Sequence, residues 1–349
     1  MAVLDARRTP QPTAAERIPA RYWVAGALLL LMPGIANDFF LYQVFGWAFI
    51  LGTIALSLQF LAGYGGMVSL LQMSVAALAG YVVAILGTSG TASISLGWPW
   101  WVVVPIALVV ACIFATVVGA LAVRTEGIYT IMITLAIAAA FFYFTRQNYT
   151  IFNGYSGFPG VLPPTVFGID WRRPVPFYYL TLGVAVVCYL VVVYVARAPF
   201  GLALQGVRDN PRRMAALGFN VFWHRVLAHS FAAVIAGLGG ILLVWQNGQV
   251  APGTAGLPAV FDILVVAIVG GLRHPVGPFI GALIYVLLRA FAPDVLQAFG
   301  MSGERFKTVV GLGFLAVVWW SPDGVLGLWD RWRALRAEGR DRLTGRVRR

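Results

Sequence analysis

Apolar segments of about 15 to 24 residues recur along most of the 349-residue chain, and they constrain its fold more than any other feature. An α-helix rises about 1.5 Å per residue, so roughly 20 apolar residues cross the ~30 Å hydrocarbon core of a bilayer. Composition agrees, because 60% of the residues are hydrophobic and 11% are charged, against about 25% charged in soluble domains. The sequence therefore predicts an all-α, polytopic membrane protein.

We expect about ten spans, several of them short or broken around a central path. They are placed at 22–36, 40–62, 67–86, 100–123, 127–145, 176–196, 226–246, 259–272, 276–292 and 306–320. Residues 1–21 would form an N-terminal tail, 22–320 the transmembrane domain and 321–349 an Arg-rich C-terminal tail. A cleaved signal peptide is the alternative for the first apolar run, although its dispersed charges are atypical of a leader.

The basic residues orient this arrangement. The net charge is +12, and the arginines cluster at the ends of apolar runs. With ten spans, nineteen basic residues fall on the side of both termini and five on the other, while Arg289 lies within a span. Positive loops stay in the cytoplasm, so both termini and the loop 197–225 are predicted to be cytoplasmic. This accounts for the charge without nucleic acid as a partner.

The loop 197–225 is a polar, Arg-rich interruption between two apolar blocks. Pro211 followed by residues up to Gly218 has the form of a short helix, with Pro in its first turn and Gly at its end. We predict that this exposed helix between spans is a docking site for a partner protein. The alternative is that the segment is only a solvated, positively charged loop. On the other side, the Gly- and Pro-rich stretch 147–175 is predicted to be a structured loop or re-entrant turn.

The sequence contains little that indicates a catalytic function. The chain has one lysine, Lys307, and lacks the GxxxxGK[ST] phosphate loop, so it is not itself an ATPase of that class. His224, His229 and His274 are expected near the membrane interface, and no acidic pair shares a span. The two cysteines lie in separate apolar runs, which indicates neither a disulfide framework nor a metal site.

Two ionisable residues, Asp262 and Arg289, fall inside predicted spans, where such residues often mark transport pathways. Both residues could instead have purely structural roles. The N-terminus of a helix favours a carboxylate such as that of Asp262, and the Arg289 side chain could snorkel outward to the membrane surface. As a coupling site they would favour the competing class, an ion-gradient-driven secondary transporter of a small solute.

Four segments, taken in order, resemble one family. They are Gly63 to Leu70 with Gln72 and Gly80-Tyr81 (G-Y-x-G-x-x-S-L-G-[HQ]…G-A-Y), Gly127-Ile128-Tyr129 through Thr134-Leu135-Ala136 (G-x-Y-F-A-x-x-T-L-A), Phe200 to Leu204 with Arg208-Asp209-Asn210 and Ala215 to Gly218 (F-G-R-A-L-x-A-I-R-[ED]-[ND]), and Gly270 to Leu272 with Gly277-Pro278 and Gly281-Ala282 (G-G-x-G-[ST]-x-x-G-P-x-x-G-A). Over about residues 40–325 the chain is similar to permease subunits of bacterial ABC importers for branched-chain amino acids, particularly the LivM-like half.

The sequence departs from that family at four places. Leu71 stands where the family usually has Gly, and Leu202 stands where it often has Arg. Arg273-His274-Pro275 replaces a small Gly-Ser/Thr turn, and residues 153–157 replace a T-G-G-x-x-G-[LI] run. The last departure lies on the outer side, so it leaves the substrate open among a leucine-like amino acid, an amide, urea or another small carboxylate.

The resemblance implies a transport subunit rather than an enzyme, located in the bacterial inner membrane. Its implied partners are a second homologous permease, two cytoplasmic ATP-binding subunits and a periplasmic substrate-binding protein. ATP and Mg would be bound by the ATPases, and no cofactor is implied for this chain.

Three sets of residues follow as candidates. Coupling to the ATPase is assigned to a helix from Asp209 to Gly218, with an apolar face flanked by arginines: Arg208, Asp209, Asn210, Arg212, Arg213, Met214, Ala215, Ala216, Leu217 and Gly218. The substrate path is assigned to Ser69, Gln72, Tyr81, Tyr129 and Thr134, for which packing and interhelical hydrogen bonds are the alternative. Packing or hinge roles are assigned to Gly63, Gly65, Gly66, Gly270, Gly271, Gly277, Pro278 and Gly281.

Overall fold

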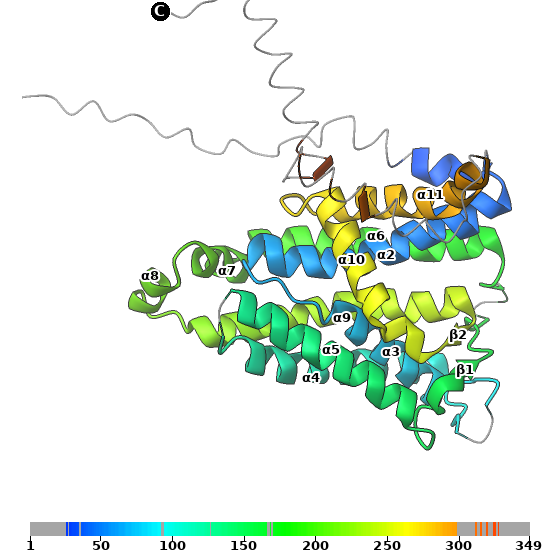
Figure 1. Cartoon of the computed structure of the whole chain (residues 1–349), viewed down its shortest axis with the longest axis horizontal. Coiled ribbons are helices and arrows are strands. Elements are labelled where there is room, and N and C mark those ends of the chain that lie inside the picture. The colour runs from blue at the N-terminus through cyan, green and yellow to red at the C-terminus, as the bar shows by residue number, and fades with distance from the viewer. Residues whose placement is uncertain are drawn as a thin grey trace, which may run out of the picture.

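The computed structural model describes residues 26, 28–34, 36–91, 94–125, 127–165, 168, 170–298 and a few isolated positions between 311 and 327. Figure 1 shows a bundle of helices with one small β-ribbon. The helices are η1 Met32–Gly34, η2 Phe40–Gly46, α2 Trp47–Gln59, η3 Phe60–Tyr64, α3 Gln72–Leu86, α4 Trp100–Ala122, α5 Ile128–Gln147, η4 Gly154–Ser156, α6 Pro174–Arg197, α7 Pro199–Asp209, α8 Pro211–Ala216, α9 Val221–Asn247, η5 Pro252–Ala255, α10 Leu257–Gly270 and α11 Gly277–Ala298. The predicted all-α class is confirmed.

Five helices in the described part are long and apolar enough to cross a membrane: Phe40–Tyr64, Trp100–Ala122, Ile128–Gln147, Pro174–Arg197 and Val221–Asn247. Three shorter apolar helices, Gln72–Leu86, Leu257–Gly270 and Gly277–Phe291, fall at the other predicted spans between residues 40 and 292. The first predicted span is described only in part. The tenth, 306–320, lies outside the described residues except for isolated positions.

The third predicted span begins later than expected. α3 starts at Gln72 rather than at residue 67, because the backbone of 66–71 leaves the helical path after Gly66, whose φ is +66°. Two amides of this stretch find partners elsewhere: Met67 donates to the Leu61 carbonyl at 3.0 Å, and Leu70 donates to Thr134 Oγ1 at 3.2 Å. The span is therefore broken at its start, and its polar backbone is covered by protein.

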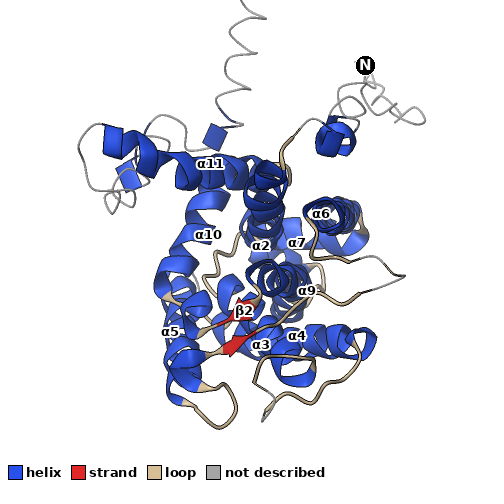
Figure 2. Ribbon diagram, turned by 90° about the vertical axis from the view of Figure 1, so that its right-hand side faces the viewer, coloured by secondary structure: helices blue, strands red, loops and turns tan. Residues whose placement is uncertain are grey.

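Helices α2 and α9 occupy the centre of the bundle, as the view in Figure 2 shows. The apolar window of the helix that contains α2 is 89% buried and that of α9 is 72% buried, against 28% for α5. Small residues allow the close packing, since a Cβ at Gly239 would meet Ile54 Cγ1 at 2.5 Å. α4, α5 and α6 therefore present broad outer faces to the lipid or to partner proteins.

The connections gather on two opposite ends of the bundle. At one end, here called the α7–α8 face, α7 contacts the segment 63–66, which Gln59 links to the α10–α11 connection, and α8 projects beyond α7 (Figure 1). At the other end, the ribbon face, β1 (Phe158–Pro159) pairs antiparallel with β2 (Gln249–Val250), and the Gly90 amide donates to the Pro159 carbonyl at 2.7 Å. The described residues of 148–165 thus form a structured loop, one of the two forms that the sequence predicts for this region.

A backbone crossing between α10 and α11 supplies one stability prediction. A Cβ at Gly281 would collide with the Val266 carbonyl and approach Gly270 N to 2.7 Å. Gly183, in the middle of α6, has no described atom within 4 Å of such a Cβ. We expect Gly281→Ala to destabilise the protein by about 1–3 kcal/mol or more, as overpacking does, and to lower its melting temperature in detergent. Gly183→Ala should be neutral or slightly stabilising; equal melting temperatures for both variants would contradict the close crossing.

Candidate functional site at the α7–α8 face

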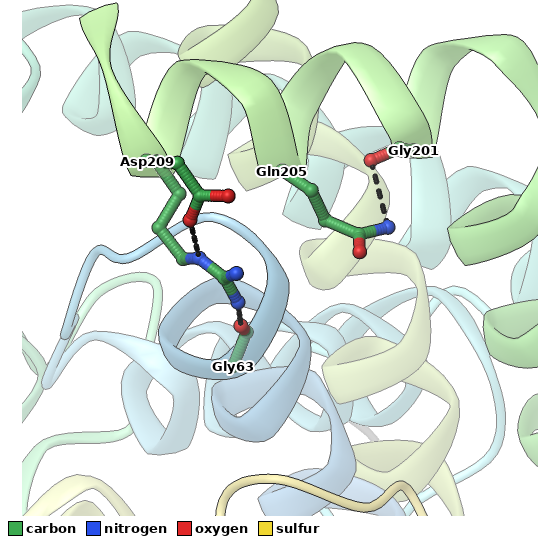
Figure 3. Close-up of polar contacts among 5 residues, drawn as sticks. Gly63, Gly201, Gln205 and Asp209 are labelled. Atoms are coloured by element: carbon green, nitrogen blue, oxygen red, sulfur yellow. Dashed lines mark hydrogen bonds and ion pairs between the residues drawn. The ribbon is translucent and has the colours of Figure 1, made fainter. Parts of the chain in front are cut away.

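The loop predicted to carry one short helix contains two, and the first, α7, is held against the bundle. Pro199 at its first position and the buried residues Gly201, Leu204 and Val207 form one apolar side at helical spacing. Gln205 Nε2 donates to the Gly201 carbonyl within α7 at 3.1 Å (Figure 3). It also donates to the Ala196 carbonyl at 2.9 Å, which ties α7 to the end of α6.

The second helix, α8, is set by its own caps. Asn210 has φ −154°, which ends α7, and its side chain accepts a hydrogen bond from the Arg213 amide at 2.9 Å. At the other end Gly218 adopts φ +89°, while Gly218 and Phe219 donate to the carbonyls of Ala215 and Met214. This is a Schellman C-cap, which favours glycine. The predicted coupling helix from Asp209 to Gly218 is therefore shortened to Pro211–Ala216, with Asp209 in α7.

α8 touches the bundle through one side only. A Cβ at Gly206 would lie 2.8 Å from Met214 Sδ, so Met214 packs on α7 rather than on an outside partner. None of the six residues of α8, all described, is buried, and Leu217 just beyond it is 67% exposed. The outward-facing candidates are Arg212, Arg213, Ala215, Ala216 and Leu217.

Arg208 turns inward, away from the exposed part of α8. Its guanidinium donates from Nη1 to the Gly63 carbonyl and from Nε to Asp209 Oδ1 at 2.9 Å, which Figure 3 shows. A Cβ at Gly66 would collide with Arg208 Cγ, so the glycine makes room for the arginine. Arg208 thereby joins α7 to the turn after α2, a contact that the sequence did not predict.

The same turn is joined to the α10–α11 connection. Gln59 Nε2 donates to the Leu272 carbonyl at 3.0 Å, and a Cβ at Gly63 would meet that carbonyl. Beyond it, Gly270 and Gly277 approach each other backbone to backbone, with Gly271 at φ +105° and Pro278 in the first turn of α11. A continuous contact path therefore runs from α7 through the 63–66 turn to α11. Sequence reasoning missed Gln59, although a polar residue within an apolar span was a usable signal.

The five substrate-path candidates do not form one group. Ser69, Gln72 and Thr134 are buried near one another around the broken start of α3. Thr134 Oγ1 accepts from the Leu70 amide, and Ser57 Oγ donates to Gln72 Oε1 at 2.9 Å. Thr134 and Gln72 thus use polar atoms in bonds between separate segments of the bundle, whereas Ser69 Oγ accepts locally from the Leu71 amide at 3.4 Å.

The two tyrosines lie apart from that cluster. Tyr129, in the first turn of α5, is 66% exposed. Tyr81, in α3, is fully buried, with its ring edge-on to Phe152 at 5.1 Å between centroids. It supports the loop of the ribbon face. Whether any of the five residues meets a substrate stays a prediction.

The intramembrane ionisable residues form a separate cluster. Tyr285 of α11 hydrogen-bonds Asp262 of α10 and also interacts electrostatically with Arg289. The Arg289 guanidinium lies 5.2 Å from the centroid of a Trp47 ring. Asp262 and Arg289 are thus engaged in the protein, which fits their structural reading. Among the described residues, no group of three or more His, Cys, Asp or Glu converges as a metal site would require.

These features define a class: a multi-pass α-helical membrane protein with a broken central helix and a short exposed helix on its Arg-rich face. Residues 40–318 match the family described as "Branched-chain amino acid transport system / permease component". The chain belongs to this family, whose members are components of ABC transporters, and the resemblance noted from the sequence is confirmed.

Individual relatives share fewer than a third of the aligned residues with this chain. The chain is 23% identical to the branched-chain amino acid permease protein LivM of Escherichia coli, over 78% of this chain and 67% of that protein. It is 29% identical to BraD of Pseudomonas aeruginosa over 48% of this chain and 55% of BraD. It is also 21% identical to the ribose import permease protein RbsC of Haemophilus influenzae, over 71% of this chain and 76% of RbsC. No solved structure matches the chain.

Proposed function

We propose that this chain is the membrane permease subunit of an ABC importer that moves branched-chain amino acids, or related small amino acids or amides, into the cytoplasm. One observation carries the proposal: no residue of α8 is buried, yet the helix is capped at both ends and braced on α7 through Met214. An exposed helix that is fixed to the bundle can receive a push from a soluble partner and pass it on.

In this mechanism the α7–α8 face is cytoplasmic, in the bacterial inner membrane, and both terminal tails lie on that side of the 22–320 domain. Arginines support this orientation, since Arg124, Arg197, Arg212 and Arg213 lie there. Two partner ATPases bind ATP and Mg, and one of these ATPases binds α8. A second, homologous permease and a periplasmic binding protein complete the importer. The names of the relatives, which describe permease proteins of branched-chain amino acid transport systems, support the role of a permease subunit within such an assembly.

Movement of α8 would reach the membrane through the contact path described above. The Arg208 link carries it to the 63–66 turn, and the Gln59–Leu272 bond carries it to the α10–α11 crossing. Because Ser69 and Gln72 follow that turn directly, their buried cluster is the part of the interior that would rearrange first. We propose that this rearrangement exposes Ser69, Gln72 and Thr134 to the substrate.

The experiment is reconstitution of the complete importer in liposomes with labelled leucine. We expect uptake that requires ATP and is insensitive to collapse of ion gradients. Asp262→Asn should leave uptake within about twofold of the unmodified protein, because Asp262 is a structural partner of Tyr285. The rival gradient-driven function would give uptake without the ATPases, and Asp262→Asn would abolish it.

A further inference from the structure

A cavity on the ribbon face is lined by none of the residues assigned above. Its volume is about 640 Å³, which is in the range of small-molecule sites. Its lining comes from the end of α3, the start of α4 and the loop residues 160–165, together with Trp245 of α9. The α7–α8 face is at the other end of the bundle, so this cavity is remote from the coupling contacts.

The walls of the cavity are held by backbone bonds rather than by side-chain packing alone. Leu96, Gly97 and Trp98 donate to the carbonyls of Ile85, Gly87 and Leu86 at 2.8–3.0 Å, which folds one wall back on α3. The opposite wall is fixed where Val161 donates to the Gly248 carbonyl at 3.0 Å. Fixed walls are expected of a site that receives a ligand without large reorganisation.

The lining combines one positive charge with apolar and hydroxyl groups. Arg172 is the charged residue among the described lining residues, and no described Asp or Glu lines the cavity. Trp98, Trp100 and several aliphatic residues supply apolar walls, while Thr88 and Ser89 supply hydroxyls. A guanidinium binds a carboxylate through two parallel hydrogen bonds. Such a lining can pair the carboxylate of a small apolar amino acid with Arg172 and its ammonium with the hydroxyl oxygens of Thr88 and Ser89.

The geometry points to a binding site on the ribbon face for the carboxylate of a small amino acid, with Arg172 as its anion-binding residue and the tryptophans around its side chain. This inference rests on the proposed function, because that function places the ribbon face outward and an amino acid in front of it. The cavity would accept substrate before the central path opens.

Photo-crosslinking with the diazirine analogue of leucine tests this site in the full chain in lipid nanodiscs. We expect labelling of peptides that contain residues 88–104 and 160–172, competed by L-leucine but at least tenfold less well by L-leucinol, which lacks the carboxylate. Arg172→Gln should reduce labelling about tenfold, Arg172→Lys should retain most of it, and Arg173→Gln is the matched control. Both arginines are exposed, so these variants should fold.

The inference is overturned if Arg172→Gln labels like the unmodified chain, or if leucinol competes as well as leucine. Labelling needs neither ATP nor partner subunits. Absent labelling with intact ATP-driven leucine uptake would therefore reject the cavity alone. Labelling at the cavity without any ATP-driven uptake would reject the proposed function and leave the site standing.

Discussion

Replacing Ala216 by arginine is expected to abolish ATP-driven uptake and to reduce ATPase association by at least a hundredfold. Ala216 ends α8, is exposed, and lies between Ala215 and the 67% exposed Leu217. A partner groove that closes over these small side chains would have to bury a long, unpaired cation, which costs several kcal/mol. The bundle itself should be undisturbed, because the new side chain points to solvent when the chain is alone.

Co-purification of the ATPases and uptake in liposomes measure the two effects. Gln147→Arg is the matched control: Gln147 is also exposed at a helix end, but α5 ends on the ribbon side of the bundle. It should leave ATPase binding unchanged. If Ala216→Arg retains the ATPases at normal stoichiometry, α8 is not the docking helix and the exposed loop is only a solvated positive segment.

Replacing Arg208 by alanine should have the second-largest effect, and of a different kind. The ATPases should still bind, because Arg208 faces the Gly63 carbonyl rather than the exposed side of α8. Uptake should fall about tenfold or more, since a charge-assisted hydrogen bond that links α7 to the membrane bundle is lost. ATP hydrolysis would then continue without matching transport.

The ratio of ATP hydrolysed to leucine imported is the measurement, because a merely structural defect would lower both together. Arg124→Ala is the control, because Arg124 is exposed and belongs to neither α7 nor α8. Arg208→Lys should recover part of the transport, since an ammonium can still donate to the Gly63 carbonyl. An unchanged ratio in Arg208→Ala would mean that coupling runs through other contacts.

Much of the fold could be read from the chain because the bilayer imposes simple local rules. The helices between residues 40 and 292 fall where apolar runs of span length occur, and the connections alternate between the two ends of the bundle. α8 was recognisable from Pro211 and Gly218, which are local cap signals. α7 was missed as a helix, although Pro199 and the spacing of Gly201, Leu204 and Val207 were available signals.

The candidate site was only partly predictable, because local sequence patterns do not show where a side chain packs. Met214 was assigned to the docking surface because it lies within the predicted helix, and Arg208 because it directly precedes that helix in sequence. The structure directs both toward the bundle, one to Gly63 and the other to Gly206. Side-chain direction at the end of a short helix depends on what packs beneath it, which no local pattern encodes.

The sequence by itself determined that the chain belongs in a bilayer and which family it resembles, and it predicts which side of the membrane carries most of the arginines. These properties are sums over neighbouring residues: apolar length, charge and motif order. Only the tertiary structure decided that Arg208 meets a carbonyl 145 positions away and that Gln59 meets one 213 positions away. Such pairings depend on how the helices cross, and the crossings are set by close backbone contacts at glycines far apart in the chain.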